Sequence, residues 1–161
     1  MVMKVNGCIG VLPIECVNPR KNKWKVRWNI TEKEDGSSDW YEQDYDHKPT
    51  LEEIRDTIVK FHNGQVDAKI LSGFSWKDMP VWLSSENQFN YKASFDLAVQ
   101  TNGQNLPVRF KFGTDKDPKY YDFKTIDELS DFYTSAIKFI NDTLQEGWAE
   151  KDSVDFSVYS I

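Results

Sequence analysis

LPVRFKFGTDKDPKYYDFKTIDELSDFYTSAIKFINDTLQEGW, residues 106–148, decides the fold of this 161-residue chain. Residues 106–112 alternate between apolar and polar side chains, which is the period of a strand with one buried face. GTDKDP follows as a turn signal. Residues 120–124 then alternate again, so the stretch predicts a β-hairpin.

A long amphipathic helix is predicted directly after this hairpin. Thr125 and Glu128 have the spacing of a capping box, so the helix should begin there. Its apolar residues recur at helical spacing and form one broad stripe: Ile126, Leu129, Phe132, Tyr133, Ala136, Ile137, Ile140 and Leu144. Gly147 is a natural helix stop. The stretch is a packing unit and carries no catalytic pattern.

A similar unit is predicted nearer the N-terminus. Residues 23–30 alternate between apolar and basic or polar side chains, and residues 40–45 form the return strand. Acidic side chains on the return strand can pair with Lys25 and Arg27 across the hairpin. Thr50 and Glu53 form a second capping box, and we expect that helix to stop at the Asn-Gly pair 63–64.

Both units read as a hairpin followed by a Thr-capped helix, and their first strands contain VRWNI and VRFKF. We interpret them as a degenerate internal repeat. The alternative is that shared patterning produces the similarity, since pattern fixes topology weakly.

The middle of the chain predicts a third hairpin and helix. Residues 69–76 and 80–83 read as strands, and Ser85 with Gln88 forms a third capping box. The helix that follows is apolar on most of its circumference, so we expect it to be largely buried; its apolar residues are Phe89, Tyr91, Ala93, Phe95, Leu97 and Ala98. Residues 152–161 are either a last strand or a docking arm.

These elements predict an α+β fold: two β-hairpin–helix units with a central hairpin–helix between them. We place a domain boundary between an N-terminal hairpin–helix unit, residues 1–65, and a C-terminal α+β domain, residues 66–161. One continuous domain is the alternative.

Composition excludes some partners. The net charge of −6 and a pI near 5.0 disfavour nucleic acid, which needs a clustered basic face, and an anionic membrane surface. No apolar run predicts a membrane span or a signal peptide, so we expect a soluble protein in the cytoplasm. Cys8 and Cys16 are expected to be free thiols there; a disulfide closed across a hairpin is the alternative.

Patterns of catalytic and metal-binding residues are mostly lacking. The chain has no phosphate-binding or dinucleotide-binding loop. Ser135 and Lys138 match a nucleophile–base spacing without its companion motifs, and Tyr120 with Lys124 matches a proton-transfer pair without a cofactor loop. A zinc site would need residues whose spacing fits no ligand pattern: Cys8, Cys16, His47 and His62. We therefore predict no catalytic residue, metal or cofactor.

The tryptophans and tyrosines are the better clue, because aromatic residues make up 14% of the chain. They either fill the core or form an exposed aromatic surface for a protein or a sugar. We select six as the candidate interaction surface: Trp40, Tyr41, Tyr45, Trp76, Trp82 and Trp148.

A resemblance covers residues 70–159. FSWKDMPVWLSSENQFNYKASFDLA, LPVRFKFG and YYDFKTIDELSDFYTSAIKFINDTLQEGWAEKD resemble uncharacterised phage and prophage proteins. The segment looks like the C-terminal domain of unknown function that is attached to tail-fibre-like and fibre-assembly-like proteins. The matching features are Trp76, the segments 81–83 and 90–93, and Gly147-Trp148. The resemblance implies a phage origin and transfers no catalytic residue.

Three hypotheses for function follow. The first is a non-enzymatic, phage-derived structural or assembly module that acts by protein–protein contact, in the host cytoplasm or in the virion. The second is a glycan-binding module that uses exposed Trp and Tyr. The third is an enzyme with an unrecognised carboxylate site. The sequence leaves the partner and the oligomeric state open.

Overall fold

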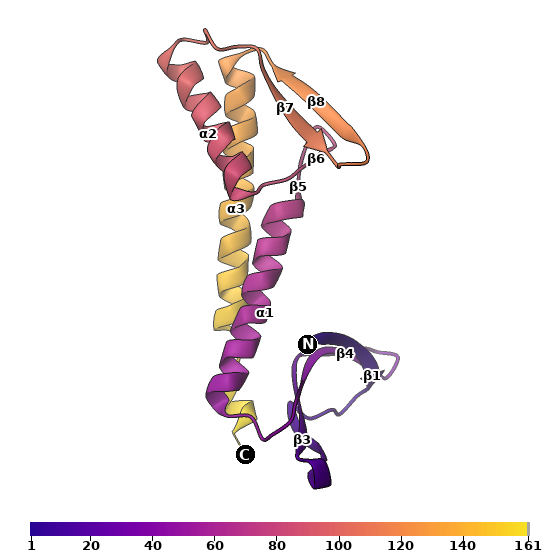
Figure 1. The fold of residues 1–161 in the computed structure, drawn as a ribbon. Coiled ribbons are helices and arrows are strands. Elements are labelled where there is room, and N and C mark those ends of the chain that lie inside the picture. Colours follow the sequence, from indigo (N-terminus) through magenta and orange to yellow (C-terminus); the bar gives the residue numbers. More distant parts are fainter. Residues whose placement is uncertain (161) are drawn as a thin grey trace. The chain divides into compact units, whose positions relative to one another are not determined.

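The computed structural model describes residues 1–160, which form two compact units (Figure 1). Unit 1 comprises Met1–His62 and the chain from Lys151 on, and unit 2 comprises Asn63–Glu150. Both combine strands with helix, so the predicted α+β class is confirmed. The division lies close to the predicted boundary at 65–66, but the tail belongs with unit 1 and not with the second domain.

Unit 1 is built on an antiparallel four-stranded sheet in the order β1-β4-β3-β2. Its strands are β1 (Met3–Cys8), β2 (Ile14–Asn18), β3 (Lys23–Glu32) and β4 (Ser37–Tyr45), with a 3₁₀ turn at Pro19–Lys21. The predicted hairpin is therefore the central pair of the sheet. Cys8 and Cys16 lie on its two outer strands, and both are free thiols. Two strands, β4 and β3, lie between these outer strands. Because neighbouring strands are about 4.8 Å apart, the two cysteines are too far apart for a disulfide.

The core of unit 1 joins the sheet to a helix and to the tail. Helix α1 (Leu51–Ser72) contributes Ile54 and Ile58, which pack with Val26 and Trp28 of β3. The predicted capping box at its start is confirmed, because the Thr50 amide donates to Glu53 at 2.7 Å and the Glu53 amide donates to the Thr50 hydroxyl at 3.2 Å.

The tail is a docking arm, since it forms no strand. It ends in a 3₁₀ turn at Phe156–Tyr159, and the buried Tyr159 hydroxyl donates to the carbonyl of Arg27 at 2.8 Å. A side chain far along the sequence thereby reaches the backbone of β3.

Unit 2 contains two separate hairpins, one whole helix and parts of two others. Its elements are β5 (Phe74–Trp76), β6 (Met79–Val81), α2 (Ser85–Gln100), β7 (Val108–Gly113), β8 (Pro118–Phe123) and α3 (Ile126–Asp152). The β7–β8 hairpin leads directly into α3, as predicted (Figure 1). The order β3-β4-α1 and β7-β8-α3 repeats a hairpin and a helix, and common ancestry of the two stays a prediction.

Three predicted helix boundaries are wrong. Helix α1 continues through the Asn-Gly pair to Ser72, so the strand predicted at 69–76 shrinks to β5. Helix α3 continues through Gly147 to Asp152. Helix α2 is capped by Ser84, whose hydroxyl accepts from the Asn87 amide at 3.2 Å, and not by Ser85.

Gly147 has a packing role that explains the continued helix. A Cβ atom placed there would lie 2.2 Å from Cγ2 of Val66 on α1, so the two helices approach through the missing side chain. Gly64, in contrast, faces open space. A glycine can therefore lie inside a helix at the point where another helix packs closely against it, and it need not mark the end of the helix.

Phe132 of α3 is the centre of the core of unit 2. It is fully buried and contacts six other rings with centroid separations between 5.0 and 6.3 Å: Phe74, Trp76, Tyr91, Phe110, Phe112 and Phe123. These rings come from β5, α2, β7 and β8, so one side chain links every other element of the unit except β6 and α1. Within residues 1–160, no helix is both long and apolar enough to cross a membrane.

We expect Gly147→Ala to lower the free energy of unfolding by about 1–3 kcal/mol, because the branched side chain of Val66 has little freedom to move away. The matched control is Gly64→Ala, which should raise that free energy by about 0.5–1 kcal/mol, since the position is helical and open. Urea denaturation measures both values. Equal stabilisation by the two substitutions would show that the α1–α3 contact is looser than described.

Candidate interaction surface

The six aromatic residues selected from the sequence lie in very different environments. On β4, Trp40 is only 6% exposed, and Tyr41 and Tyr45 are half-buried against α1. In unit 2, Trp76 is half-buried against Phe132. The other two, Trp82 and Trp148, are each 53% exposed. The structure therefore gives core roles to four of the six.

A second exposed surface lies on α2, where the sequence predicted burial. Phe89 is 74% exposed, Leu97 is 46% exposed, and Ala93 lies between them at helical spacing. We call these three residues the α2 stripe. The opposite face of the helix is buried through Tyr91 and Ala98.

The prediction that α2 is largely buried is wrong because the helix packs along one side. Tyr91 contacts Phe110 of β7 and Phe132 of α3, and Phe95 stacks on Tyr133 of α3 at a centroid separation of 5.4 Å. Figure 1 shows α2 beside the first part of α3. The helix therefore has one apolar face in the core and a second apolar face exposed to water.

The α2 stripe is bordered by charged side chains. Lys92 and Asp96 form an ion pair one helical turn apart, and Glu86 lies in the first turn. The side-chain amide of Asn87 donates to the carbonyl of Trp82 at 2.7 Å, which ties the chain entering the helix to its first turn. The surface is thus an apolar ridge with an ion pair beside it and an exposed carboxylate near its start.

A shallow hollow of about 460 Å³ lies along α3. Tyr133 and Ile137 line it together with the polar side chains of Asn141 and Gln145. Lys138, which the sequence placed near Ser135 as a weak nucleophile–base pair, forms an ion pair with Asp142 on the same face. This pairing is typical of a solvated helix surface.

Unit 1 contains a buried cluster of charges that the sequence indicated in part. Glu42 is 5% exposed, and its carboxylate accepts hydrogen bonds from Lys25, from Arg27 Nε at 3.3 Å and from Trp40 Nε1 at 3.0 Å. The predicted pairing of acidic β4 residues with Lys25 and Arg27 is confirmed. Arg27 also donates to Glu15 at 2.8 Å.

Several carboxylates have pKa values lowered by the basic side chains that they pair with. Burial acts to raise the pKa of Glu42, but the hydrogen bonds from Lys25 and Trp40 outweigh it and lower that pKa. Hydrogen bonds from basic side chains likewise lower the pKa values of Asp39, Asp46 and Asp122. These carboxylates therefore remain charged at neutral pH.

Another small polar cluster joins the two hairpins of unit 2 to α3. Lys77 donates to the Tyr121 hydroxyl at 2.7 Å and pairs with Glu128 at 3.1 Å, and that hydroxyl also donates to Glu128. Hydrogen bonds from Tyr121 and Lys77 lower the pKa of Glu128, so it stays charged at neutral pH. Tyr120, the residue selected from the sequence, is exposed and outside the cluster.

The cysteines and histidines considered for a zinc site do not form one among the described residues. Across residues 1–160, no group of three or more His, Cys, Asp or Glu side chains could hold a metal ion. His47 instead contacts Glu53 at 2.8 Å, and His62 is buried in α1. The arrangement gives no support to the zinc alternative.

Comparison with known proteins does not identify the role of these surfaces. No model of a protein family, no curated protein and no solved structure matches the chain.

We expect Glu42→Gln to destabilise unit 1 by about 3–5 kcal/mol at pH 7, because Lys25 and Arg27 would lose a buried counter-charge. Asp44→Asn is the matched control, since Asp44 pairs with the same lysine from a largely exposed position and should change stability by less than about 1 kcal/mol.

The same carboxylate predicts a pH dependence. A lowered folded-state pKa adds stability above the unfolded-state pKa, and this stability is lost as the pH falls through the folded-state value. Urea unfolding between pH 7 and pH 3 should therefore show a smaller decline for Glu42→Gln than for the native chain. An identical decline in both proteins would refute the role of Glu42.

Proposed function

We propose that this chain is a non-enzymatic module that acts by protein–protein contact, with the α2 stripe as its contact surface. The observation that carries the proposal is Phe89, which is 74% exposed on a regular helix whose other face is in the core. A large aromatic side chain in water costs free energy that a partner surface can recover.

The shape of the stripe indicates the kind of partner. Phe89, Ala93 and Leu97 lie at positions i, i+4 and i+8, so they project as one line along the helix. Such a line fits an apolar groove, and this chain would supply the inserted helix. A sugar is a weaker fit, because Phe89 is followed on the stripe by two aliphatic side chains and no polar group.

Magnitudes indicate how far the contact must extend. Full burial of Phe89 and Leu97 contributes about 1.5–3 kcal/mol each. Their sum, about 3–6 kcal/mol, is below the 8 kcal/mol or so of a micromolar complex, even before the cost of association. A stable complex therefore needs contacts beyond the stripe, for which Trp82 before the helix and Val99 near its end are exposed.

The partner we propose is a component of a phage particle or of its assembly. Support comes from the resemblance of residues 70–159 to domains of tail-fibre-like and fibre-assembly-like proteins. The α2 stripe and Trp82 both fall within those residues. The module would then act in the cytoplasm of the host cell or in the virion.

A photo-crosslinking residue placed at Phe89 tests the proposal. We expect p-benzoylphenylalanine at this position to form an adduct with one protein partner in cells that carry the phage. The matched control is the same residue at Tyr120, which is exposed in the same unit on β8. Leu97→Ser should abolish the adduct and change the stability by less than about 0.5 kcal/mol.

Equal adducts from positions 89 and 120, or an adduct that survives Leu97→Ser, would contradict the proposal. An adduct with a second copy of the chain would retain the protein contact and refute the phage partner.

A further inference from the structure

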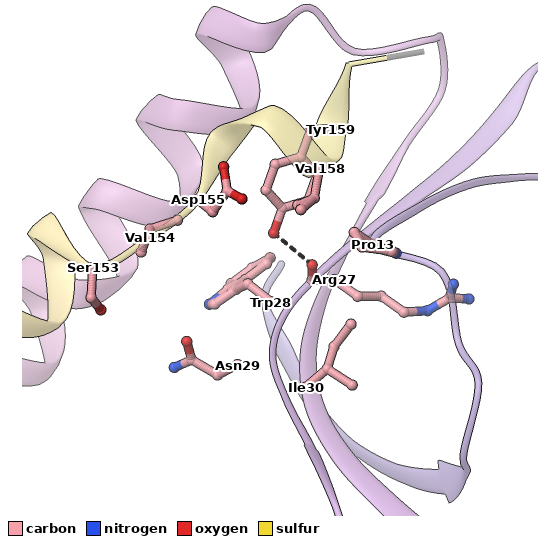
Figure 2. Close-up of a pocket in the computed structure, with 10 residues that line it drawn as sticks. All are labelled: Pro13, Arg27, Trp28, Asn29, Ile30, Ser153, Val154, Asp155, Val158 and Tyr159. Carbon is pink, nitrogen blue, oxygen red and sulfur yellow. Dashed lines mark hydrogen bonds between the residues drawn. The ribbon is translucent and has the colours of Figure 1, made fainter.

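A second hollow, of about 260 Å³, lies within unit 1 between β3 and the tail (Figure 2). Apolar walls come from Pro13 and Ile30 on one side and from Val154 and Val158 of the tail on the other. The size suits one amino-acid side chain with its peptide group, and it is below the range of drug-sized ligand pockets.

A β-bulge shapes the strand side of this hollow. Trp28 is paired with Tyr41 and Thr31 with Asp39, so Asn29 and Ile30 together face one residue of β4. Asn29 has a φ of 53°, in the left-handed region. The bulge directs the exposed carboxamide of Asn29 to the border of the hollow (Figure 2).

An unused hydrogen-bond donor is buried in the wall of the hollow. Trp28 is 3% exposed, and its indole Nε1 has no hydrogen-bond partner among residues 1–160. In Figure 2 this nitrogen lies on the side of the ring that faces Asn29 and Ser153. A buried donor without an acceptor is costly, so an acceptor at this place would be favoured.

The edge of β3 beside the hollow is only partly paired with another strand. Strand β2 pairs with β3 through Lys23–Val26, and the Arg27 amide donates to the Pro13 carbonyl at 2.7 Å. Beyond Arg27, no described strand pairs with β3 on this side. The tail borders the edge there, with the Tyr159 hydroxyl on the Arg27 carbonyl.

We propose that this hollow is a binding site for an extended peptide segment with an aliphatic side chain. A peptide carbonyl of the ligand accepts from Trp28 Nε1–H, and the aliphatic side chain packs against Ile30 and Val158. The Asn29 carboxamide, which has both a donor and an acceptor, pairs with a neighbouring peptide group. The Asp155 carboxylate, which accepts from Ser157, disfavours an acidic segment.

Indole signals in ¹⁵N NMR spectra test this site, since the chain has six tryptophans. The probes are N-acetyl-leucine methylamide, its blocked Leu-Leu-Leu analogue and, as a charged control, N-acetyl-leucine. We expect the two neutral probes to shift the Trp28 indole signal in a saturable way, the tripeptide binding more tightly. The Trp76 indole, which is also buried without a partner, should not shift because it lies in unit 2.

Two variants make the test specific. Trp28→Phe keeps an aromatic ring and removes the donor, so it should weaken binding of the tripeptide roughly 2- to 12-fold, followed by isothermal calorimetry. Asn29→Gly keeps the left-handed backbone conformation and should also weaken binding, which covers the case that Trp28→Phe does not fold. Leu97→Ser on the α2 stripe should leave the binding unchanged, so the two sites are tested separately.

Three outcomes would overturn the proposal. The first is an unshifted Trp28 indole at saturating probe. The second is an equal response of the exposed Trp82 and Trp148 indoles, which would indicate non-specific association. The third is equal affinity for the single residue and the tripeptide, which would refute an extended peptide as the ligand.

Discussion

The contact between Tyr91 and Phe132 is the interaction on which the proposed binding surface depends. The two rings meet edge to face with centroids 5.0 Å apart, inside the hydrophobic cluster of unit 2. Because Tyr91 and Ala98 face this cluster, the rotation of α2 about its axis is determined. Phe89, Ala93 and Leu97 must then face away from it. The packing of the core of unit 2 thus keeps the α2 stripe exposed to water, and no core contact is lost by this exposure.

Unit 1 is held together by a different kind of interaction. Its central strands carry charges into the interior, where Glu42 is satisfied by two basic side chains and an indole N–H. Such a cluster is stable while every member is present. Next to it, the bulge at Asn29 and the docked tail leave a hollow with one unused donor at Trp28. The strand that carries the charge cluster also carries the proposed peptide site.

Sequence reasoning located the elements that depend on local chemistry. The hairpins that begin at Lys23 and Val108 follow from the alternation of apolar and polar side chains. The capping boxes at Thr50 and Thr125 follow from side chains that form hydrogen bonds with the nearby backbone. Gly147 was misread because a glycine that ends a helix and one that admits a neighbouring helix look the same in sequence. The burial of α2 was misjudged for a similar reason, since periodicity counts apolar faces and does not say which face meets the core.

The two proposed sites could not be predicted from the sequence for a further reason. A stripe is recognisable only when its exposure is known, and four of the six aromatic residues selected for exposure, Trp40 among them, serve the core. The hollow near Trp28 combines a bulge, a strand edge and residues of the tail more than a hundred positions later. Such a combination leaves no local pattern.

Hydrogen–deuterium exchange of the chain, alone and in complex with the partner crosslinked at position 89, is the most direct test of the central claim. The account predicts that amides of Ser85–Gln100 gain protection in the complex, while those of the β3–β4 hairpin exchange as in the free chain. Protection confined to unit 1, with α2 unchanged, would contradict it.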